Sequence, residues 1–207
     1  MEWNNYKSLE AGNDKYGNDR LKLAIHLKNK VLNEISNPWF IENGTLLGAY
    51  RDGKFIPHDD DFDIGILIED MSEIKTIKKA IDNSLPNYYH SRIVDTYCNK
   101  IEIFDPAFGN YILKGPEYNG ANYHFITVDI QFYLRQENEK YRCLYNISPN
   151  KVIVDKNIII PLGKIKLENE YFNCPGQIVD FLKLNYGSIE AGAKYDKNTG
   201  LYHLENQ

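Results

Sequence analysis

Two hydrophobic periods divide this chain into segments that predict helices and segments that predict strands. Apolar residues recur at the helical spacing of 3.6 residues in three segments, which are 19–35, 72–85 and 175–187. Alternation with a period of two, or a short apolar run, marks four segments: 39–41, 61–68, 100–105 and 125–133. The pattern predicts an α+β fold with a mixed β-sheet flanked by helices, followed by a C-terminal β-hairpin and helix.

The ends of these elements follow from capping and turn residues. Asn18 or Asp19 is expected to cap the first helix, which Pro38 ends, and Pro175 and Gly187 are expected to bound the last helix. Residues 108–123, rich in Tyr and Gly, predict a long irregular loop.

Three further segments complete the expected organisation. Residues 142–160 predict β-hairpins around a Pro149–Asn150 turn, and the polar tail from Ser188 is expected to fray. We expect one domain, 1–207, with a core of about 19–135 and an extension of about 140–190.

Composition narrows the function classes. The chain has 207 residues and a net charge of -5, which argues against broad nucleic-acid binding. No signal-peptide pattern and no apolar run long enough to span a bilayer is found in the sequence. Cys98, Cys143 and Cys174 are odd in number and widely spaced, so they predict buried thiols in a cytoplasmic protein rather than disulfides.

The segment from Asn43 to Ile68 holds the candidate chemistry. It contains four carboxylates within five residues, and the acids run directly into the predicted strand. Asp61 and Asp63 fall on one face of that strand, with Cα atoms about 6.5–7 Å apart. Two such acids repel each other, and a divalent cation of the Mg²⁺ type between them removes the repulsion.

The acids allow two other interpretations. A solvated turn is common for acid runs, but it fits poorly beside an apolar strand. A Ca²⁺ loop with Asp59 at its first position would need Gly at its sixth position and Glu at its twelfth, where this chain has Ile64 and Asp70.

A helix start lies just before the acids. Thr45 can cap a helix that runs through about Tyr50, with Gly53 after its end. Because helix N-termini carry free N–H groups and partial positive charge, Gly44 and Thr45 form a candidate phosphate-binding site. Further along, Asp129 is a lone acid in the middle of an apolar strand, which either serves a site or faces solvent.

The order of these parts resembles the nucleotidyltransferase fold and, within it, the LicD and fukutin-related family. The residues that carry the resemblance are GTLLGAYR at 44–51, KFIPHDDDFDI at 54–64, TVDIQFY at 127–133, IPLGKIKLENEYFNCP at 160–175 and the Tyr-Gly pair at 186–187. The resemblance covers about residues 38–190. His58 departs from it, because the family usually has Trp there.

The resemblance implies a reaction class and a set of site residues. Bacterial members resemble phosphocholine transferases that act on surface glycans, and animal members transfer ribitol phosphate from a CDP-activated donor. Asp61, Asp63 and Asp129 are then expected to bind one or two Mg²⁺ or Mn²⁺ ions, and Asp129 or another nearby acid to act as base. The residues expected to hold the donor phosphates are Gly44, Thr45, Arg51 and Lys164. Asp59 is expected to contact the donor or to support the metal ligands.

Three alternative functions stay open from the sequence. The same fold could transfer a nucleoside monophosphate to a protein, an RNA or a small molecule. It could instead hold a glycan without turnover. The chain could also be a structural protein with an incidental acid cluster.

Overall fold

The computed structural model of the chain describes residues 14–56, 59, 61–95, 99–105, 110–112, 122–124, 126–145, 153–190, 193–196, 199 and 201–204. The helices are α1 (Asp14–Leu27), which continues as a π-helix, η1 (Lys28–Leu32), then α2 (Asn43–Asp52), α3 (Glu73–Ser84), α4 (Lys156–Ile159) and α5 (Ile178–Tyr186). The strands are β1 (Trp39–Ile41), β2 (Asp63–Ile68), β3 (His90–Val94), β4 (Lys100–Phe104), β5 (Asn110–Ile112), β6 (Asn122–His124), β7 (Ile126–Gln136), β8 (Lys140–Cys143), β9 (Val154–Asp155), β10 (Gly163–Leu167), β11 (Glu170–Cys174), β12 (Lys194–Asp196) and β13 (Leu201–His203).

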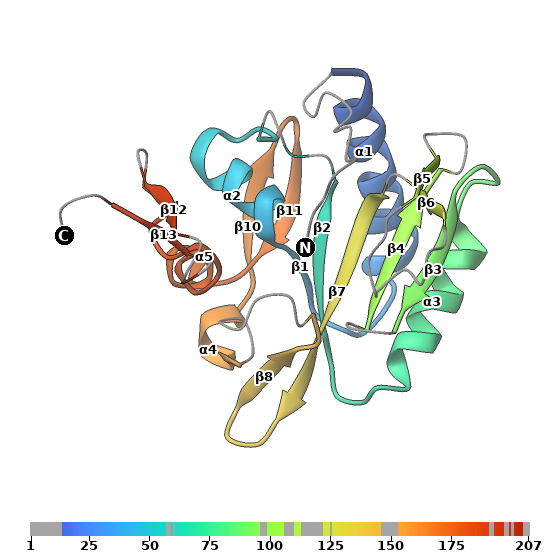
Figure 1. Ribbon diagram of the computed structural model, residues 1–207. Helices are drawn as coiled ribbons and strands as arrows, with labels where there is room; N and C mark the ends of the chain where they lie inside the picture. The colour runs from blue at the N-terminus through green and yellow to red at the C-terminus, as the bar shows by residue number, and fades with distance from the viewer. Residues whose placement is uncertain are drawn as a thin grey trace.

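The centre of the molecule is a mixed sheet in the order β1-β2-β7-β4-β3. It is extended by β8, which pairs with the second half of β7, and by β9, which pairs with β8. Strands β2 and β7 run parallel, and β1, β4 and β3 pair antiparallel with their neighbours. Figure 1 shows α1 and α3 on the side of β4 and β3, and α2, α5 and the β10–β11 hairpin gathered on the other side. The predicted α+β class is confirmed, including the C-terminal hairpin and helix.

Strand β2 is apolar apart from Asp63 and is buried on both faces. All six of its residues are buried, because β2 lies between β1 and β7 with helices and a hairpin around it. Gly65 is needed where Phe40 of β1 crosses: a Cβ at this position would lie 2.7 Å from the Phe40 ring. The strand therefore holds Asp63 at a fixed place on the edge of a packed core.

Several predicted boundaries are wrong at the N-terminal ends of helices. The first helix begins at Asp14 rather than at Asp19, and α2 begins at Asn43, so Thr45 lies inside α2 and is not its cap. The prediction for 72–85 is confirmed by α3, and Gly53, in the left-handed conformation, ends α2 as expected.

Other predictions fail where long-range contacts decide the structure. Strand β3 was not predicted, and 156–159 forms the short helix α4 instead of a hairpin strand. The tail after Ser188 forms the β12–β13 hairpin, which contacts α5. Residues 110–112 and 122–124 pair as strands inside the expected loop. The predicted Pro149–Asn150 turn lies outside the described residues, as do Cys98 and His58.

Candidate functional site

A row of four charged residues crosses the sheet at one level. Asp63 of β2 pairs with Asp129 of β7, Asp129 pairs with Glu102 of β4, and Glu102 pairs with Arg92 of β3. Direct cross-strand neighbours place their side chains on the same face of a sheet. The two acids that the sequence placed on separate strands thus lie side by side.

The loop before β2 brings two further acids, Asp59 and Asp61, to Asp63. Asp59, Asp61 and Asp63 offer carboxylate oxygens that all lie within 4.8 Å of one another. Arg20 of α1 holds this loop, because its Nη1 donates to the carbonyl oxygens of Asp59 at 2.6 Å and Asp61 at 3.1 Å. The tight cluster therefore includes Asp59, which was expected to contact the donor or to support the metal ligands, and its backbone is fixed from the first helix.

Asp63 lies deepest in the cluster, where α2 fixes it. The hydroxyl of Thr45, fully buried, accepts the N–H of Asp63 at 2.9 Å, and Asn43 donates to Asp63 Oδ1 at 3.2 Å. Burial, together with the charges of Asp59, Asp129 and Glu42, raises the pKa of Asp63 well above its usual range. Its environment therefore disfavours a carboxylate that has no cation nearby.

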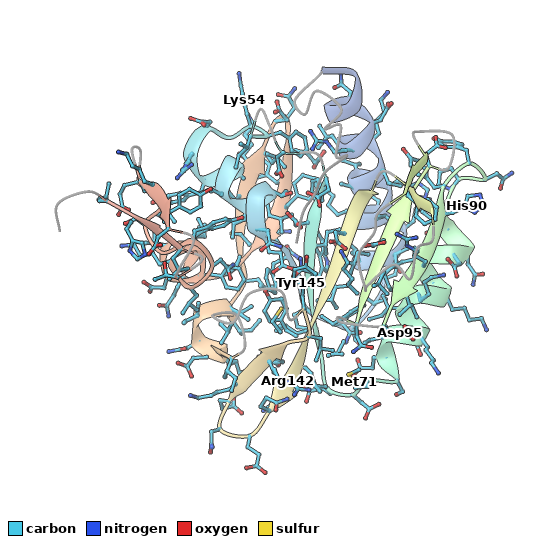
Figure 2. All side chains as sticks on the ribbon, viewed as in Figure 1. Lys54, Met71, His90, Asp95, Arg142 and Tyr145 are labelled. Carbon is cyan, nitrogen blue, oxygen red and sulfur yellow. The ribbon has the colours of Figure 1, made fainter. Side chains whose placement is uncertain are left out.

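Asp129 is held by a buried lysine. Lys100 Nζ lies 2.8 Å from Asp129 Oδ2 and 2.9 Å from Glu102 Oε1, and 5.1 Å from the ring centre of Tyr145, which is labelled beside β7 in Figure 2. Burial raises the pKa of Asp129, although Lys100 opposes the increase. Burial alone would lower the pKa of Lys100, but Asp129 and Glu102 outweigh it and raise that pKa.

The second oxygen of Asp129 is the atom that points to a ligand. Among the described residues Asp129 Oδ1 is buried and has no hydrogen-bond partner. Buried polar atoms normally have partners, so an orphaned carboxylate oxygen beside further carboxylates fits a hard divalent cation. The donor set of Asp61, Asp63 and Asp129, with Asp59 added, consists of oxygen atoms only, which is what Mg²⁺ or Mn²⁺ prefers.

The N-terminus of α2 borders a cavity of about 290 Å³. One side is lined by Gly44, Leu47, Arg51, Ile56 and Asp59. A Cβ at Gly44 would lie 2.5 Å from Asp59 Oδ2, so a side chain there would displace the Asp59 carboxylate. The cavity thus shares Asp59 with the acid cluster and reaches the first turn of α2, as a phosphate-binding site would.

The other side of the cavity comes from the C-terminal segment and is lined by Tyr186, Ser188, Glu190, Ala193 and Tyr202. Arg51, predicted to bind phosphate, donates from Nε and Nη2 to the carbonyl oxygen of Ile189 at 3.1 and 2.6 Å. It lines the cavity while tying this segment to α2. Lys164 is exposed on β10 and is not among the residues that line the cavity.

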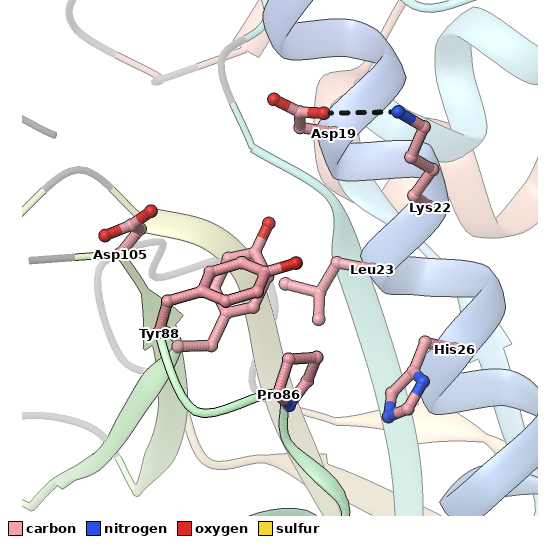
Figure 3. Close-up of a pocket in the computed structure, with 8 residues that line it drawn as sticks. Asp19, Lys22, Leu23, His26, Pro86, Tyr88 and Asp105 are labelled. Atoms are coloured by element: carbon pink, nitrogen blue, oxygen red, sulfur yellow. Dashed lines mark ion pairs between the residues drawn. The ribbon is translucent and has the colours of Figure 1, made fainter. Parts of the chain in front are cut away.

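A second cavity, of about 310 Å³, lies between α1 and the segment that leads into β3 (Figure 3). Its lining includes an Asp19–Lys22 ion pair and the closely spaced rings of Tyr88 and Tyr89. Burial, with Tyr88 and Asp19, raises the pKa of Tyr89 to about 12. None of the predicted site residues lines this cavity.

Sequence reasoning missed four residues of the site. Arg20 and Lys100 gave no signal, because a basic residue on a helix or at a strand start usually faces solvent. Glu42 precedes the helix start and is fully buried, where Tyr133 donates a hydrogen bond to it. Tyr186 belongs to the Tyr-Gly pair that ended the family pattern, but its place in the cavity depends on how α5 packs.

Comparison with known protein families decides the identity. The model of the LicD/FKTN/FKRP family, nucleotidyltransferase domain, matches residues 36–177, which is most of the chain and includes β1, α2, the acid loop, β2 and β7. The chain belongs to the LicD/FKTN/FKRP family. The resemblance inferred from the motifs is thereby confirmed, and the acid cluster lies inside the matched region.

Curated relatives of this LicD-family chain match only part of their own length. An uncharacterized protein of Rickettsia typhi is 27% identical over 140 residues, covering 68% of this chain and 37% of the relative. Human ribitol-5-phosphate transferase FKTN is 41% identical over 49 residues, covering 24% of this chain and 11% of the relative. An uncharacterized protein of Rickettsia prowazekii is 46% identical over 48 residues, 23% of this chain and 18% of the relative.

The described residues contain no helix both long enough and apolar enough to cross a membrane.

Proposed function

We propose that this chain is a metal-dependent phosphotransferase that moves a phospho-alcohol from a CDP-activated donor to a glycan hydroxyl. The single observation that carries the proposal is the pairing of Asp63 with Asp129, whose Oδ1 is buried and has no partner in the described part of the chain. Family membership supports a transferase of phosphate-containing groups. The similarity to a ribitol-5-phosphate transferase supports a phospho-alcohol as the transferred group.

The acids would hold one or two Mg²⁺ or Mn²⁺ ions, which when bound neutralise charge on the diphosphate. Asp61, Asp63 and Asp129 are the proposed ligands, and Asp59 is a further one because its carboxylate lies within 4.8 Å of those of Asp61 and Asp63. Thr45 and Asn43 fix Asp63, Lys100 fixes Asp129, and Arg20 fixes the loop.

The helix supplies the contact to the phosphates. The first N–H groups of α2, at Gly44 and its neighbours, have no intrahelical partners and attract anions. The acceptor hydroxyl attacks the phosphorus that carries the alcohol, the bond to the CMP oxygen breaks, and a carboxylate of the site accepts the hydroxyl proton. The protein mainly aligns the donor with the acceptor. In phosphoryl transfer, such positioning together with charge stabilisation provides most of the rate enhancement.

A donor screen tests this function. The protein is incubated with Mn²⁺ or Mg²⁺, a glycan acceptor and CDP-choline, CDP-ribitol or CDP-glycerol, and the products are analysed by mass spectrometry. We expect CMP release and an acceptor heavier by one phospho-alcohol with at least one donor, and no product when the metal is chelated. Addition of a nucleoside monophosphate to the acceptor would instead establish nucleotidyl transfer, and full activity without metal would contradict the proposal.

A further inference from the structure

The C-terminal segment contributes a wall of the cavity that joins the acid cluster. Its residues follow position 177, where the family match ends, so this wall is built by a part of the chain that the family model does not describe. The opposite wall is α2 and the acid loop, including Gly44 and Asp59. A ligand in the cavity would therefore contact residues of the matched region on one side and residues beyond that region on the other.

The wall is held by backbone contacts. Arg51 donates two hydrogen bonds to the carbonyl oxygen of Ile189, and the N–H of Ser188 donates to the carbonyl oxygen of Tyr202 at 2.8 Å. Gly187 has a positive φ of 71°, and a Cβ there would lie 2.6 Å from the same Tyr202 oxygen. The Ser188 and Gly187 contacts use the main-chain oxygen of Tyr202, so the Tyr202 side chain can be changed without removing them.

Two aromatic rings stand in this wall. Tyr186 ends α5 and Tyr202 lies on β13, with ring centres 6.4 Å apart and ring planes inclined by 55°. Tyr186 lines the cavity together with Gly44 and Asp59. Tyr202 is 38% exposed and stands at the rim. The cavity thus has Asp59 in one wall and the two tyrosines, with Glu190, in the other, and we call the part beside the tyrosines its aromatic end.

We propose that the aromatic end holds the pyrimidine base of the donor, stacked on Tyr202 and flanked by Tyr186. This inference rests on the proposed function. The cavity adjoins the acid cluster through Asp59, so a nucleotide whose phosphates lie at the acids can place its base in the cavity. A cavity of about 290 Å³ with aromatic and aliphatic walls and a few polar groups suits a nucleoside.

Titration calorimetry with CMP and Mn²⁺ tests the proposal, using Tyr202→Ala, Tyr202→Leu and Tyr202→Phe. We expect the Ala and Leu variants to bind CMP about ten-fold more weakly or worse, the size of effect that loss of one base–aromatic stack produces. Phe keeps the flat ring and should bind within two-fold of the native protein. Tyr171→Ala removes another exposed tyrosine, on β11 and outside the cavity, and should change nothing.

Further titrations with other ligands distinguish a failure of this inference from a failure of the proposed function. Cytidine, titrated without metal, should bind the native protein and lose affinity in Tyr202→Leu, whereas ribitol and choline should not depend on Tyr202. If native protein binds CMP but the donor screen yields no transfer, the proposed function fails and the base site remains. If transfer occurs and the Ala and Leu variants bind CMP within two-fold of native, or native protein binds no CMP, the base site is wrong.

Discussion

Asp63→Asn is expected to abolish phospho-alcohol transfer and, at the same time, to stabilise the metal-free protein at neutral pH. The loss of activity follows because Asn cannot supply the negative charge that a divalent cation needs. The gain in stability follows because Asp63 is buried beside Asp59, Asp129 and Glu42, where its ionised form is disfavoured. Asn keeps the oxygen that accepts from Asn43, so packing is preserved.

The raised pKa of Asp63 determines whether its contribution to the stability of the folded protein rises or falls with pH. A raised pKa means that the folded state binds the proton more tightly than the unfolded chain, whose carboxyl titrates near 3.8. The stability that protonated Asp63 contributes is fully present below about pH 3.8 and is lost as the pH rises through the raised pKa. The difference in melting temperature between the variant and the native protein should therefore be small near pH 4 and grow toward pH 7.

Melting curves with EDTA and with Mn²⁺, recorded from pH 4 to pH 8, check this prediction. Mn²⁺ should stabilise the native protein at pH 7 and leave Asp63→Asn unchanged. Asp155→Asn, which alters an exposed acid paired with Lys140, is the matched control and should behave as native. A variant that is less stable than native at pH 7 without metal, or that keeps full transfer, would refute the assignment of Asp63.

Lys100→Met should destabilise the protein by about 3–5 kcal/mol, because it leaves the buried Asp129 carboxylate without a counter-charge. Glu102 keeps Arg92 as a partner, with Nη2 2.6 Å from Glu102 Oε2, so the loss falls mainly on Asp129. Urea unfolding measures the change through the midpoint at constant slope. Lys78→Met, which breaks a more exposed pair with Asp82, should cost less than about 1 kcal/mol.

The double variant Lys100→Met/Asp129→Asn separates charge from packing. Removing the uncompensated carboxylate should restore much of the stability that Lys100→Met loses, because the two residues interact directly. If the double variant is as unstable as the sum of the two single variants, Lys100 stabilises through its packing against Tyr145 and not through Asp129. An effect of Lys100→Met no larger than that of Lys78→Met would contradict the buried-pair account.

Local patterns predicted the elements around the site, because the spacing of apolar residues and the capping and turn residues can be read from the sequence alone. The alternation after Asp61, the lone Asp129 between β-formers and Gly53 after α2 all depend on neighbours within a few residues. Those signals were enough to place the acids on two strands. The α+β class and the family pattern followed from the same segments.

What the sequence could not provide depends on pairing between distant segments. Lys100 reads as the first residue of a short strand, and only the register of β4 with β7 places it on Asp129. Asp59 is one of four acids within five residues, and only the folded loop shows that its carboxylate lies against Gly44 and beside those of Asp61 and Asp63. The tail after Ser188 is polar, yet its backbone contacts to Arg51 and within the β12–β13 hairpin hold it as a cavity wall.

The central claim is that an acid of β7 shares a cation with the acids of β2 and the loop before it. Titration of Mn²⁺ in the presence of CMP, followed by the electron paramagnetic resonance signal of free Mn²⁺, measures this directly in the native protein, Asp63→Asn, Asp129→Asn and Asp155→Asn. The account predicts that native protein and Asp155→Asn remove Mn²⁺ from solution, and that Asp63→Asn and Asp129→Asn both lose this binding. Native-like Mn²⁺ binding by Asp129→Asn would show that the two strands do not hold a common ion.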